Sequence, residues 1–222
     1  MDSHGAVKQD SRKFILGGVA MKTIYYIGGS PCCGKSTIAE RICERYGFQY
    51  YKADDLLMEF IEKGEDNGDE WLKYVLGMSI DQLWLRAPEK LREEELLTYE
   101  KLFPYIMDGL NKLDKSTPII AEGAAFLPSL VNKAGIDNKH YICIVPTREF
   151  QIRHFSERLW VNDYLESCSD KEKAFNNWME RDALFALSAM NQAQEIGYTT
   201  LVVDGAKSID ENYRLVIETF RL

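Results

Sequence analysis

The chain has 222 residues, of which 45% are hydrophobic and 28% are charged, and its formal net charge is −8. This length and composition suit one globular domain and exclude a disordered or fibrous chain. The acidic balance disfavours a nucleic-acid partner, and the longest early apolar stretch, residues 14–20, is too short to span a membrane.

The five cysteines are odd in number and lack the spacing of metal ligands. They predict free thiols in a reducing compartment, and therefore a cytoplasmic protein. Residues 1–20 are polar, contain glycine and show no periodic pattern. We expect this segment to be a disordered leader or a cloning remnant, and residues 21–222 to form a single domain.

The first predicted elements are a strand, a loop and a helix. Residues 23–27 are β-branched or aromatic and end at glycines, which indicates a buried strand. Residues 35–46 then carry apolar side chains at helical spacing and end at Gly47. The intervening residues therefore form a loop between a strand and a helix.

A second strand over residues 48–51 is followed by Asp54 and Asp55, and by a helix over residues 56–63 that stops at a polar cluster. Residues 69–113 are helical in pattern, with a capping box from Ser79 to Gln82. We expect breaks at Gly77, Pro88 and Pro104. This helical insertion, about residues 56–113, is longer than a simple crossover requires.

Three more apolar runs follow, over residues 118–121, 141–145 and 200–203, and helical stretches with capping boxes beginning at Ser169 and Ser208 separate them. Strands that alternate with helices predict a parallel sheet, and continuous apolar runs indicate that both of its faces are covered. The predicted fold is a three-layer α/β/α domain with a five-stranded parallel sheet. In such sheets ligands bind beyond the carboxyl ends of the strands.

Residues 29–36, GSPCCGKS, match the phosphate-loop pattern of glycine, four residues, glycine, lysine and serine. Backbone amides of such a loop and the amino end of the following helix bind phosphate oxygens. Lys35 would reach the β and γ phosphates of ATP, and the hydroxyl of Ser36 would bind Mg²⁺. The remaining residues expected to contact the nucleotide are Gly29, Cys32, Cys33, Gly34 and Thr37.

Two cysteines in this loop admit two interpretations. A helix amino terminus lowers the pKa of a thiol, which would make Cys32 or Cys33 sensitive to redox state. The alternative is that both are simply small residues that pack within the loop, and this interpretation is favoured.

The stretch GGSPCCGKST, Asp54 and Asp55 after the second strand, and the rhythm of five strands resemble the P-loop kinases of the nucleotide, shikimate and polynucleotide kinase group. The resemblance covers most of residues 21–222, and only the phosphate loop is specific. It implies a phosphotransferase that uses ATP and Mg²⁺ to phosphorylate a hydroxyl or phosphate of a small molecule.

The same resemblance implies roles for acidic residues after the strands. Asp54 would accept the proton of the acceptor hydroxyl or support Mg²⁺, and Asp55, Glu122 and Gly123 would face the substrate. The alternatives are that Asp54 or Asp55 caps a helix, and that Glu122 is a solvated carboxylate in a turn.

Residues 148–182 resemble the lid of this kinase group, which closes arginines over the transferring phosphoryl group. Arg153 and Arg158 are our candidates for catalysis, and Arg181 for substrate binding. The alternative is that these arginines form ion pairs on helix surfaces. Trp71, Trp84 and Arg86 could enclose the acceptor, although tryptophans at helical spacing are more typical of a core.

A second class of function is a nucleotide-dependent ATPase or switch that acts through a protein partner. Such proteins usually carry a water-positioning motif, and the sequence has no DxxG after the third strand and no guanine-reading NKxD. The leading prediction is therefore the small-molecule kinase. The pattern leaves the acceptor and the oligomeric state open.

Overall fold

The computed structural model describes residues 23–114 and 116–222, so the predicted leader, residues 1–20, lies outside the described residues. Five strands form one sheet in which every neighbouring pair is parallel, in the order β2-β3-β1-β4-β5. The strands are β1 (Ile24–Gly29), β2 (Gln49–Lys52), β3 (Ile119–Glu122), β4 (Tyr141–Pro146) and β5 (Thr199–Val203). The predicted parallel sheet is confirmed.

Helices connect the strands and extend beyond them. The helices are α1 (Lys35–Tyr46), a 3₁₀ turn η1 (Ala53–Leu56), α2 (Leu57–Asp66), α3 (Glu70–Leu76), α4 (Ile80–Trp84), α5 (Pro88–Lys112), α6 (Pro128–Lys133), α7 (Arg148–Ser156), α8 (Leu159–Tyr164), α9 (Lys171–Ile196) and α10 (Ile209–Phe220).

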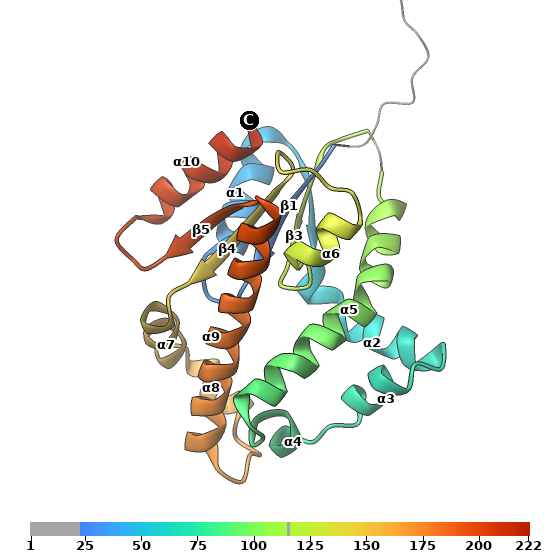
Figure 1. Cartoon of the computed structure of the whole chain (residues 1–222), viewed down its shortest axis with the longest axis vertical. Coiled ribbons are helices and arrows are strands. Elements are labelled where there is room, and N and C mark those ends of the chain that lie inside the picture. The colour runs from blue at the N-terminus through green and yellow to red at the C-terminus, as the bar shows by residue number, and fades with distance from the viewer. Residues whose placement is uncertain (1–22, 115) are drawn as a thin grey trace, which may run out of the picture.

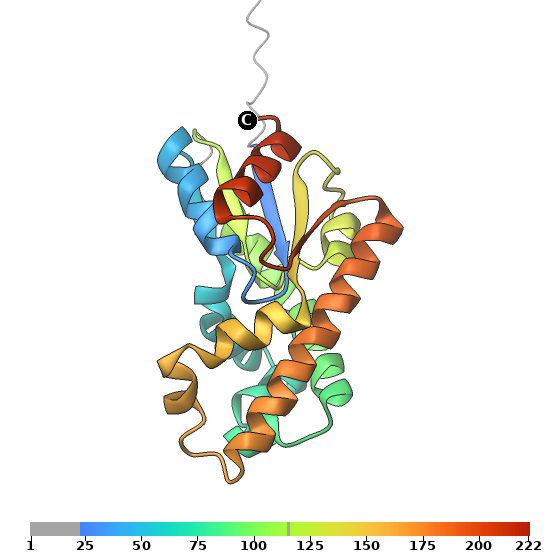
Figure 2. The ribbon, with the colours of Figure 1, turned by 90° about the vertical axis from the view of Figure 1, so that its left-hand side faces the viewer.

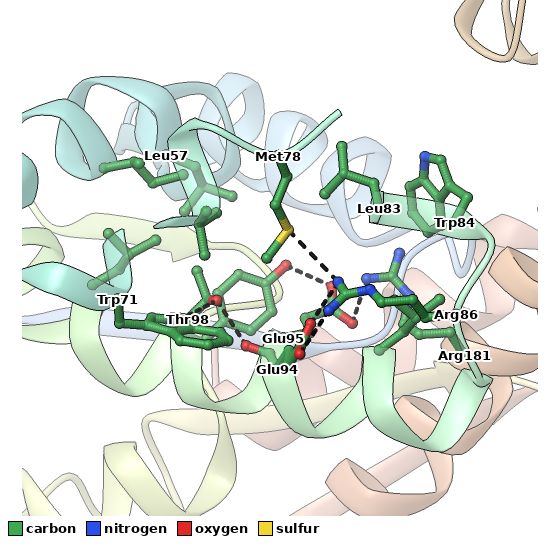
Figure 3. Close-up of a pocket in the computed structure, with 15 residues that line it drawn as sticks. Leu57, Trp71, Met78, Leu83, Trp84, Arg86, Glu94, Glu95, Thr98 and Arg181 are labelled. Carbon is green, nitrogen blue, oxygen red and sulfur yellow. Dashed lines mark hydrogen bonds and ion pairs between the residues drawn. The ribbon is translucent and has the colours of Figure 1, made fainter. Parts of the chain in front are cut away.

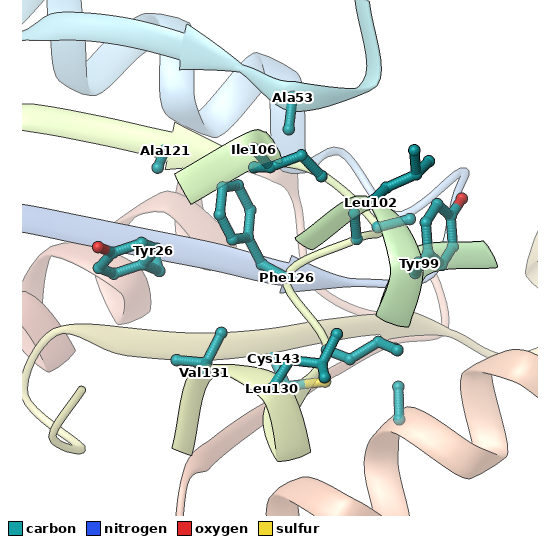
Figure 4. Close-up of a cluster of buried hydrophobic side chains, with 14 of the residues drawn as sticks. Tyr26, Ala53, Tyr99, Leu102, Ile106, Ala121, Phe126, Leu130, Val131 and Cys143 are labelled. Atoms are coloured by element: carbon teal, nitrogen blue, oxygen red, sulfur yellow. The ribbon is translucent and has the colours of Figure 1, made fainter. Parts of the chain in front are cut away.

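Both faces of the sheet are covered, which gives three layers. Helices α1 and α10 lie on one face, and α5, α6 and α9 lie on the other (Figures 1 and 2). On the second face Phe126 packs edge-on against Tyr26, with ring centroids 5.4 Å apart, and Ile106 of α5 lies beside them (Figure 4). The lower half of Figure 1 holds α3, α4, α7 and α8, beyond the carboxyl ends of the strands.

Helix α9 begins one residue later than its sequence predicts. The side chain of Asp170 accepts a hydrogen bond from the backbone of Lys173 and caps the helix, so the prediction that Ser169 is the cap was wrong. Ser169 instead donates its backbone N–H to Asp81 at 2.8 Å, which holds it in the preceding loop. The capping boxes at Ser79 and Ser208 are confirmed.

Helix α5 is continuous through Pro104, so the predicted break there was wrong. A proline removes one helical hydrogen bond, but packing on either side offsets that loss. Leu102 and Ile106 are both fully buried in the core beneath the helix. Pro88, by contrast, begins the helix, where its missing N–H costs nothing.

All five cysteines are unpaired thiols. Within residues 23–114 and 116–222, no helix combines the length and the apolar character that crossing a lipid bilayer requires.

Candidate functional site

The phosphate loop leaves β1 and enters α1 through backbone conformations that few residues adopt. Gly29 has φ +118°, and a Cβ there would lie 1.9 Å from the carbonyl oxygen of Ile144 on β4. Cys32 has φ 65° and Gly34 has φ +80°, immediately before the helix begins. The glycines of the motif therefore let the loop turn sharply against the sheet.

Lys35 lies in the first turn of α1, and its side chain is 5% exposed. Its Nζ reaches back to donate a hydrogen bond to the carbonyl oxygen of Ser30 at 2.7 Å and lies 3.8 Å from Oε1 of Glu122. Burial alone would lower the pKa of Lys35, but the neighbouring acidic groups, Glu122 and Asp54 among them, hold it above its ordinary value. Lys35 is therefore a positive charge held beneath the loop.

Glu122 ends β3 and is almost fully buried, with 1% exposure. Its Oε2 accepts hydrogen bonds from the hydroxyls of Ser36 at 3.2 Å and Tyr50 at 3.0 Å. A hydroxyl and a carboxylate side by side are the hard oxygen donors that Mg²⁺ prefers. In the described part of the chain, no three histidine, cysteine or acidic side chains gather as a metal cluster. This donor set fits an ion that takes its other ligands from phosphates and water.

Asp54 lies in η1, just beyond β2, and its Oδ1 accepts the backbone N–H of Ala124 at 3.0 Å. A Cβ on Gly123 would lie 2.7 Å from that oxygen, so the glycine makes room for the carboxylate. Although the side chain reaches solvent, the surrounding protein desolvates it and raises the pKa of Asp54 to about 6, with Glu122 adding to this effect and Lys35 opposing it.

The structure also separates the two aspartates. Lys52 and Leu56 occupy the N-cap positions of η1 and α2, so the alternative that either aspartate caps a helix is wrong. Asp55 is exposed and pairs with Lys52 at 3.0 Å. Asp54 alone faces the backbone that follows Glu122.

The arginines of residues 148–182 lie in different environments. Nη2 of Arg158 lies 3.5 Å from the sulfur of Cys32, so α7 and α8 meet the phosphate loop through this side chain. Arg153 lies over the ring of Phe150, with its Cζ 5.5 Å from the ring centroid. Arg148 pairs with Glu180 on the surface at 3.0 Å.

The two loop cysteines fit the interpretation of small packed residues. Cys33 is 2% exposed, and its thiol donates to the carbonyl oxygen of Ser30 at 3.1 Å. Burial raises the pKa of Cys33, and it also raises the pKa of Cys32 despite the nearby Arg158. Neither thiol has the lowered pKa that a reactive cysteine requires.

Arg181 is buried at the base of a pocket enclosed by α2, α3, α4, α5 and α9 (Figure 3). Its Nη1 lies 2.6 Å from Oε2 of Glu95 and its Nε lies 2.7 Å from Oδ1 of Asp182. The pocket has a volume of about 180 Å³, and Trp71 and Trp84 contribute to its apolar wall. These two tryptophans therefore line a cavity, while Trp84 is also buried in a hydrophobic cluster, as the core interpretation expects.

Sequence reasoning did not single out Tyr50, Tyr99 or Asp182, and it named Glu95 only as the end of a charged stretch over residues 89–95. Asp182 is fully buried behind the loop, where its backbone carbonyl lies 3.4 Å from the hydroxyl of Ser30. The hydroxyl of Tyr99 donates to Glu95 at 3.2 Å. Charged residues in the middle of helices are normally solvated, so only the packing of α5 against α9 reveals that these are buried.

A family described as an AAA domain matches residues 28–121, which include the phosphate loop and Asp54 and end at Ala121 on β3. An adenylate kinase of Thermococcus onnurineus (strain NA1) is 45% identical over 49 residues, a match that spans 22% of this chain and 22% of the adenylate kinase. The matched part is therefore about a fifth of that protein.

Solved structures similar to the chain include a gluconokinase from Sinorhizobium meliloti 1021, at 13% identity and a TM-score of 0.47, which covers 90% of this chain and 91% of that one. Another is TT1252 from Thermus thermophilus, at 16% identity and a TM-score of 0.45, with 90% and 97% coverage. TM-scores this low give these two likenesses no weight for function.

The strand order and the position of the phosphate loop say more about the class of protein than these structural likenesses do. The loop joins the central strand β1 to α1, and β3, which carries Glu122, lies directly beside β1. This order brings a basic side chain, a hydroxyl and carboxylates to one edge of a parallel sheet, where ligands bind. This loop, this sheet and the family match over residues 28–121 together give the chain the fold and the phosphate loop of a P-loop NTPase.

Proposed function

We propose that the chain is an ATP- and Mg²⁺-dependent phosphotransferase that moves the γ-phosphoryl group of ATP to a small-molecule acceptor. The observation that carries this proposal is the position of Asp54, whose carboxylate lies close enough to Lys35 of the phosphate loop and to Glu122 at the end of β3 for both charges to act on it. A carboxylate so placed can receive a proton from a hydroxyl that attacks the γ-phosphorus.

In this proposal the backbone amides of the loop and Lys35 bind the phosphates, and Ser36 with Glu122 holds Mg²⁺, which would neutralise phosphate charge when bound. Sequence reasoning assigned Glu122 to the substrate and gave Asp54 two possible roles, as the base and as a ligand of the metal. The hydrogen bond between Ser36 and Glu122 favours Glu122 for the metal and leaves Asp54 free to act as the base.

The transfer itself forms a bond between the acceptor oxygen and the γ-phosphorus and breaks the bond from that phosphorus to the oxygen bridging the β and γ phosphates. Asp54 takes the proton of the acceptor hydroxyl. Arg158, which contacts Cys32 in the loop, would stabilise charge on the transferring group, and Arg153 is the second candidate for this role. The acceptor would lie on the side of α2 to α5, and α7 and α8 would close over the phosphates.

The test is to incubate the purified protein with Mg²⁺-ATP, with and without a panel of nucleosides, sugar acids and alcohols, and to follow both ADP and phosphorylated product. We expect ADP to form only when an acceptor is present, in equal amount to its phosphorylated product. ADP release that no acceptor changes would overturn the kinase proposal and would favour an ATPase that acts through a protein partner.

The matched variants for this test are Lys35→Met and Lys133→Met. Methionine fills the volume of the lysine side chain, so Lys35→Met should keep the fold and lose transfer by at least about a thousandfold. Lys133 ends α6 and is exposed, so its substitution should leave transfer unchanged. Unchanged turnover in Lys35→Met would remove the phosphate loop from the mechanism. A cytoplasmic location stays an expectation from the free thiols.

A further inference from the structure

The pocket enclosed by α2 to α5 combines apolar walls with two arginines (Figure 3). Arginines in a substrate pocket ordinarily suggest an anionic ligand, because a guanidinium matches the geometry of phosphate and carboxylate. The question is therefore whether these two guanidinium groups are available to a ligand.

Arg86 is not available, because the carboxylate of Glu94 pairs with both Nη atoms of its guanidinium. Nη1 of Arg86 lies 2.7 Å from Oε1 of Glu94, and Nη2 lies 2.6 Å from Oε2. Its Nε donates to the carbonyl oxygen of Gln82, and Nη2 also lies 3.6 Å from the sulfur of Met78. This bidentate pair is the arrangement that a carboxylate or phosphate ligand would itself seek.

Arg181 is not available either, because it lies between two carboxylates. It contacts Glu95 at 2.6 Å and Asp182 at 2.7 Å, and its guanidinium lies over the ring of Trp84 with Cζ 4.8 Å from the centroid. Burial and the charge of Asp182 raise the pKa of Glu95 above its ordinary range. Whichever carboxylate holds a proton, Arg181 keeps an ionised partner.

The pocket thus carries charges that cancel within the protein, set in apolar surroundings. An anionic ligand would have to separate a buried ion pair, and removing one partner of such a pair leaves the other charge uncompensated. A neutral ligand pays no such cost. Its hydroxyl groups can donate to lone pairs that Glu94 and Glu95 keep beyond their ion pairs, and its apolar body can pack on Trp71 and the leucines around it.

We propose that this pocket binds an uncharged alcohol with a flat ring system as the phosphate acceptor, and that it rejects acceptors carrying phosphate or carboxylate. The proposal rests on the proposed kinase function and names its acceptor class. The Glu95 end of the pocket is the end nearest the chemistry, because the charge of Glu95 acts on Asp54 and Arg181 adjoins Asp182 behind the loop.

The test uses pairs of probes in which a neutral alcohol and an anion share the same ring system: adenosine and uridine against their 5′-monophosphates, and 2-phenylethanol against phenylacetate. Binding to the full chain is measured by melting temperature and tryptophan fluorescence in the presence of Mg²⁺ and a non-hydrolysable ATP analogue. We expect at least one neutral probe to bind at least about tenfold more tightly than its anionic partner.

The charge argument is tested by Glu94→Gln against Glu93→Gln. The first variant leaves Arg86 without its carboxylate, so the anionic probes should gain at least about tenfold in affinity. Glu93 lies on the same helix but is 60% exposed and outside the pocket, so Glu93→Gln should change neither class of probe. Equal or tighter binding of the anionic probes by the unaltered protein would overturn the proposal.

Should Glu94→Gln fail to fold, Val75→Phe gives an independent test, because Val75 lines the pocket and is only partly buried. The larger side chain should abolish binding of the neutral probe and keep binding of the ATP analogue. Neutral binding that survives this change, or no neutral binding in the unaltered protein, would also overturn the proposal. Failure of the kinase function looks different: the neutral probe still binds, but ATP is not transferred to any acceptor.

Discussion

The hydroxyl of Ser36 lies 3.2 Å from the carboxylate of Glu122, although 86 residues separate the two along the chain. The contact exists because β3 is the neighbour of β1, so the residue that ends β3 faces the first turn of the helix that follows β1. A hydroxyl and a carboxylate in this arrangement can share an ion that also binds phosphate oxygens.

The first prediction follows from this contact. Glu122→Gln keeps the volume of the side chain and an acceptor for the Ser36 and Tyr50 hydroxyls, but it removes the negative charge. We expect the Mg²⁺ concentration for half-maximal turnover to rise by about tenfold or more. The measurement is a Mg²⁺ titration of the initial rate. Glu40→Gln, an exposed change on α1, is the control and should leave the curve in place.

The second prediction concerns Asp54, whose raised pKa of about 6 determines when it can act as a base. The carboxylate is ionised above that pH, so kcat/KM should fall as the pH drops below about 6 and should be nearly constant above it. Asp54→Asn should lower turnover by about a hundredfold or more and remove this part of the profile. Asp55→Asn is the matched control, since Asp55 is exposed and pairs with Lys52. Equal losses in both variants would contradict the role of Asp54.

The raised pKa of Asp54 also predicts how the stability of the protein depends on pH. The folded state binds a proton at Asp54 more readily than the unfolded state, so the ionised form destabilises the fold, and stability rises as the pH falls from about 6 toward 4. Asp54→Asn keeps an acceptor for the Ala124 N–H and removes the charge. We expect Asp54→Asn to raise the free energy of unfolding at pH 8 by about 1 kcal/mol, after discounting for solvent screening. Its melting temperature at pH 8 should therefore exceed that of the unaltered protein. A lower melting temperature would mean that the charge is well compensated.

The phosphate loop and the sheet could be predicted from the sequence because their signals are local. Residues 29–36 form a fixed pattern, and β1 and β4 are continuous runs of apolar or aromatic residues. Even the end of α1 could be predicted, because Gly47 adopts the left-handed conformation that terminates a helix. Pro104 was misjudged because burial of the surrounding residues outweighed a local preference.

The sequence indicated Trp71, Trp84 and Arg86 as residues that could enclose a ligand, and all three line the pocket. The pairing of charges between α5 and α9 could not be predicted, because the paired residues are far apart in the sequence and have ordinary helical spacing. Arg181 and Glu95 look like solvated charges on α9 and α5, and only the contact between those helices makes them a buried pair. Similarly, the sequence predicts a strand that ends one residue before Glu122, whereas the structure makes Glu122 the last residue of β3. Its partner Ser36 becomes evident only when the strand order is known, and local patterns do not determine that order.

Gly123 gives a prediction about positioning. Gly123→Ala would place a Cβ 2.7 Å from Oδ1 of Asp54, so the carboxylate must move. A displacement of about 1 Å at a catalytic group costs roughly a hundredfold in rate, and we expect kcat to fall by that order. Gly135→Ala is the control, because it also has a positive φ, +77°, but has no atom within 4 Å of the added carbon. The Gly135→Ala variant should lose some stability and retain kcat. If its kcat falls as much as that of Gly123→Ala, backbone strain explains both losses.

The last prediction concerns the contact between Arg158 and the phosphate loop. Arg158 lies 3.5 Å from the sulfur of Cys32, and its guanidinium lies over the ring of Phe155, with Cζ 4.8 Å from the centroid. If it stabilises charge on the transferring phosphoryl group, Arg158→Ala should lower kcat by about a hundredfold to a thousandfold and change the KM for ATP much less.

Two further variants separate this role from a structural one. Arg158→Lys keeps the charge but not the planar fork, so it should recover only part of the lost rate. Arg148→Ala breaks a surface pair with Glu180 on the same segment and should change kcat little. Rates are compared under single-turnover conditions, where product release does not contribute. If Arg158→Ala raises the KM for ATP and leaves kcat unchanged, this arginine contributes to ground-state binding of ATP, because the loss of an interaction made only in the transition state lowers kcat.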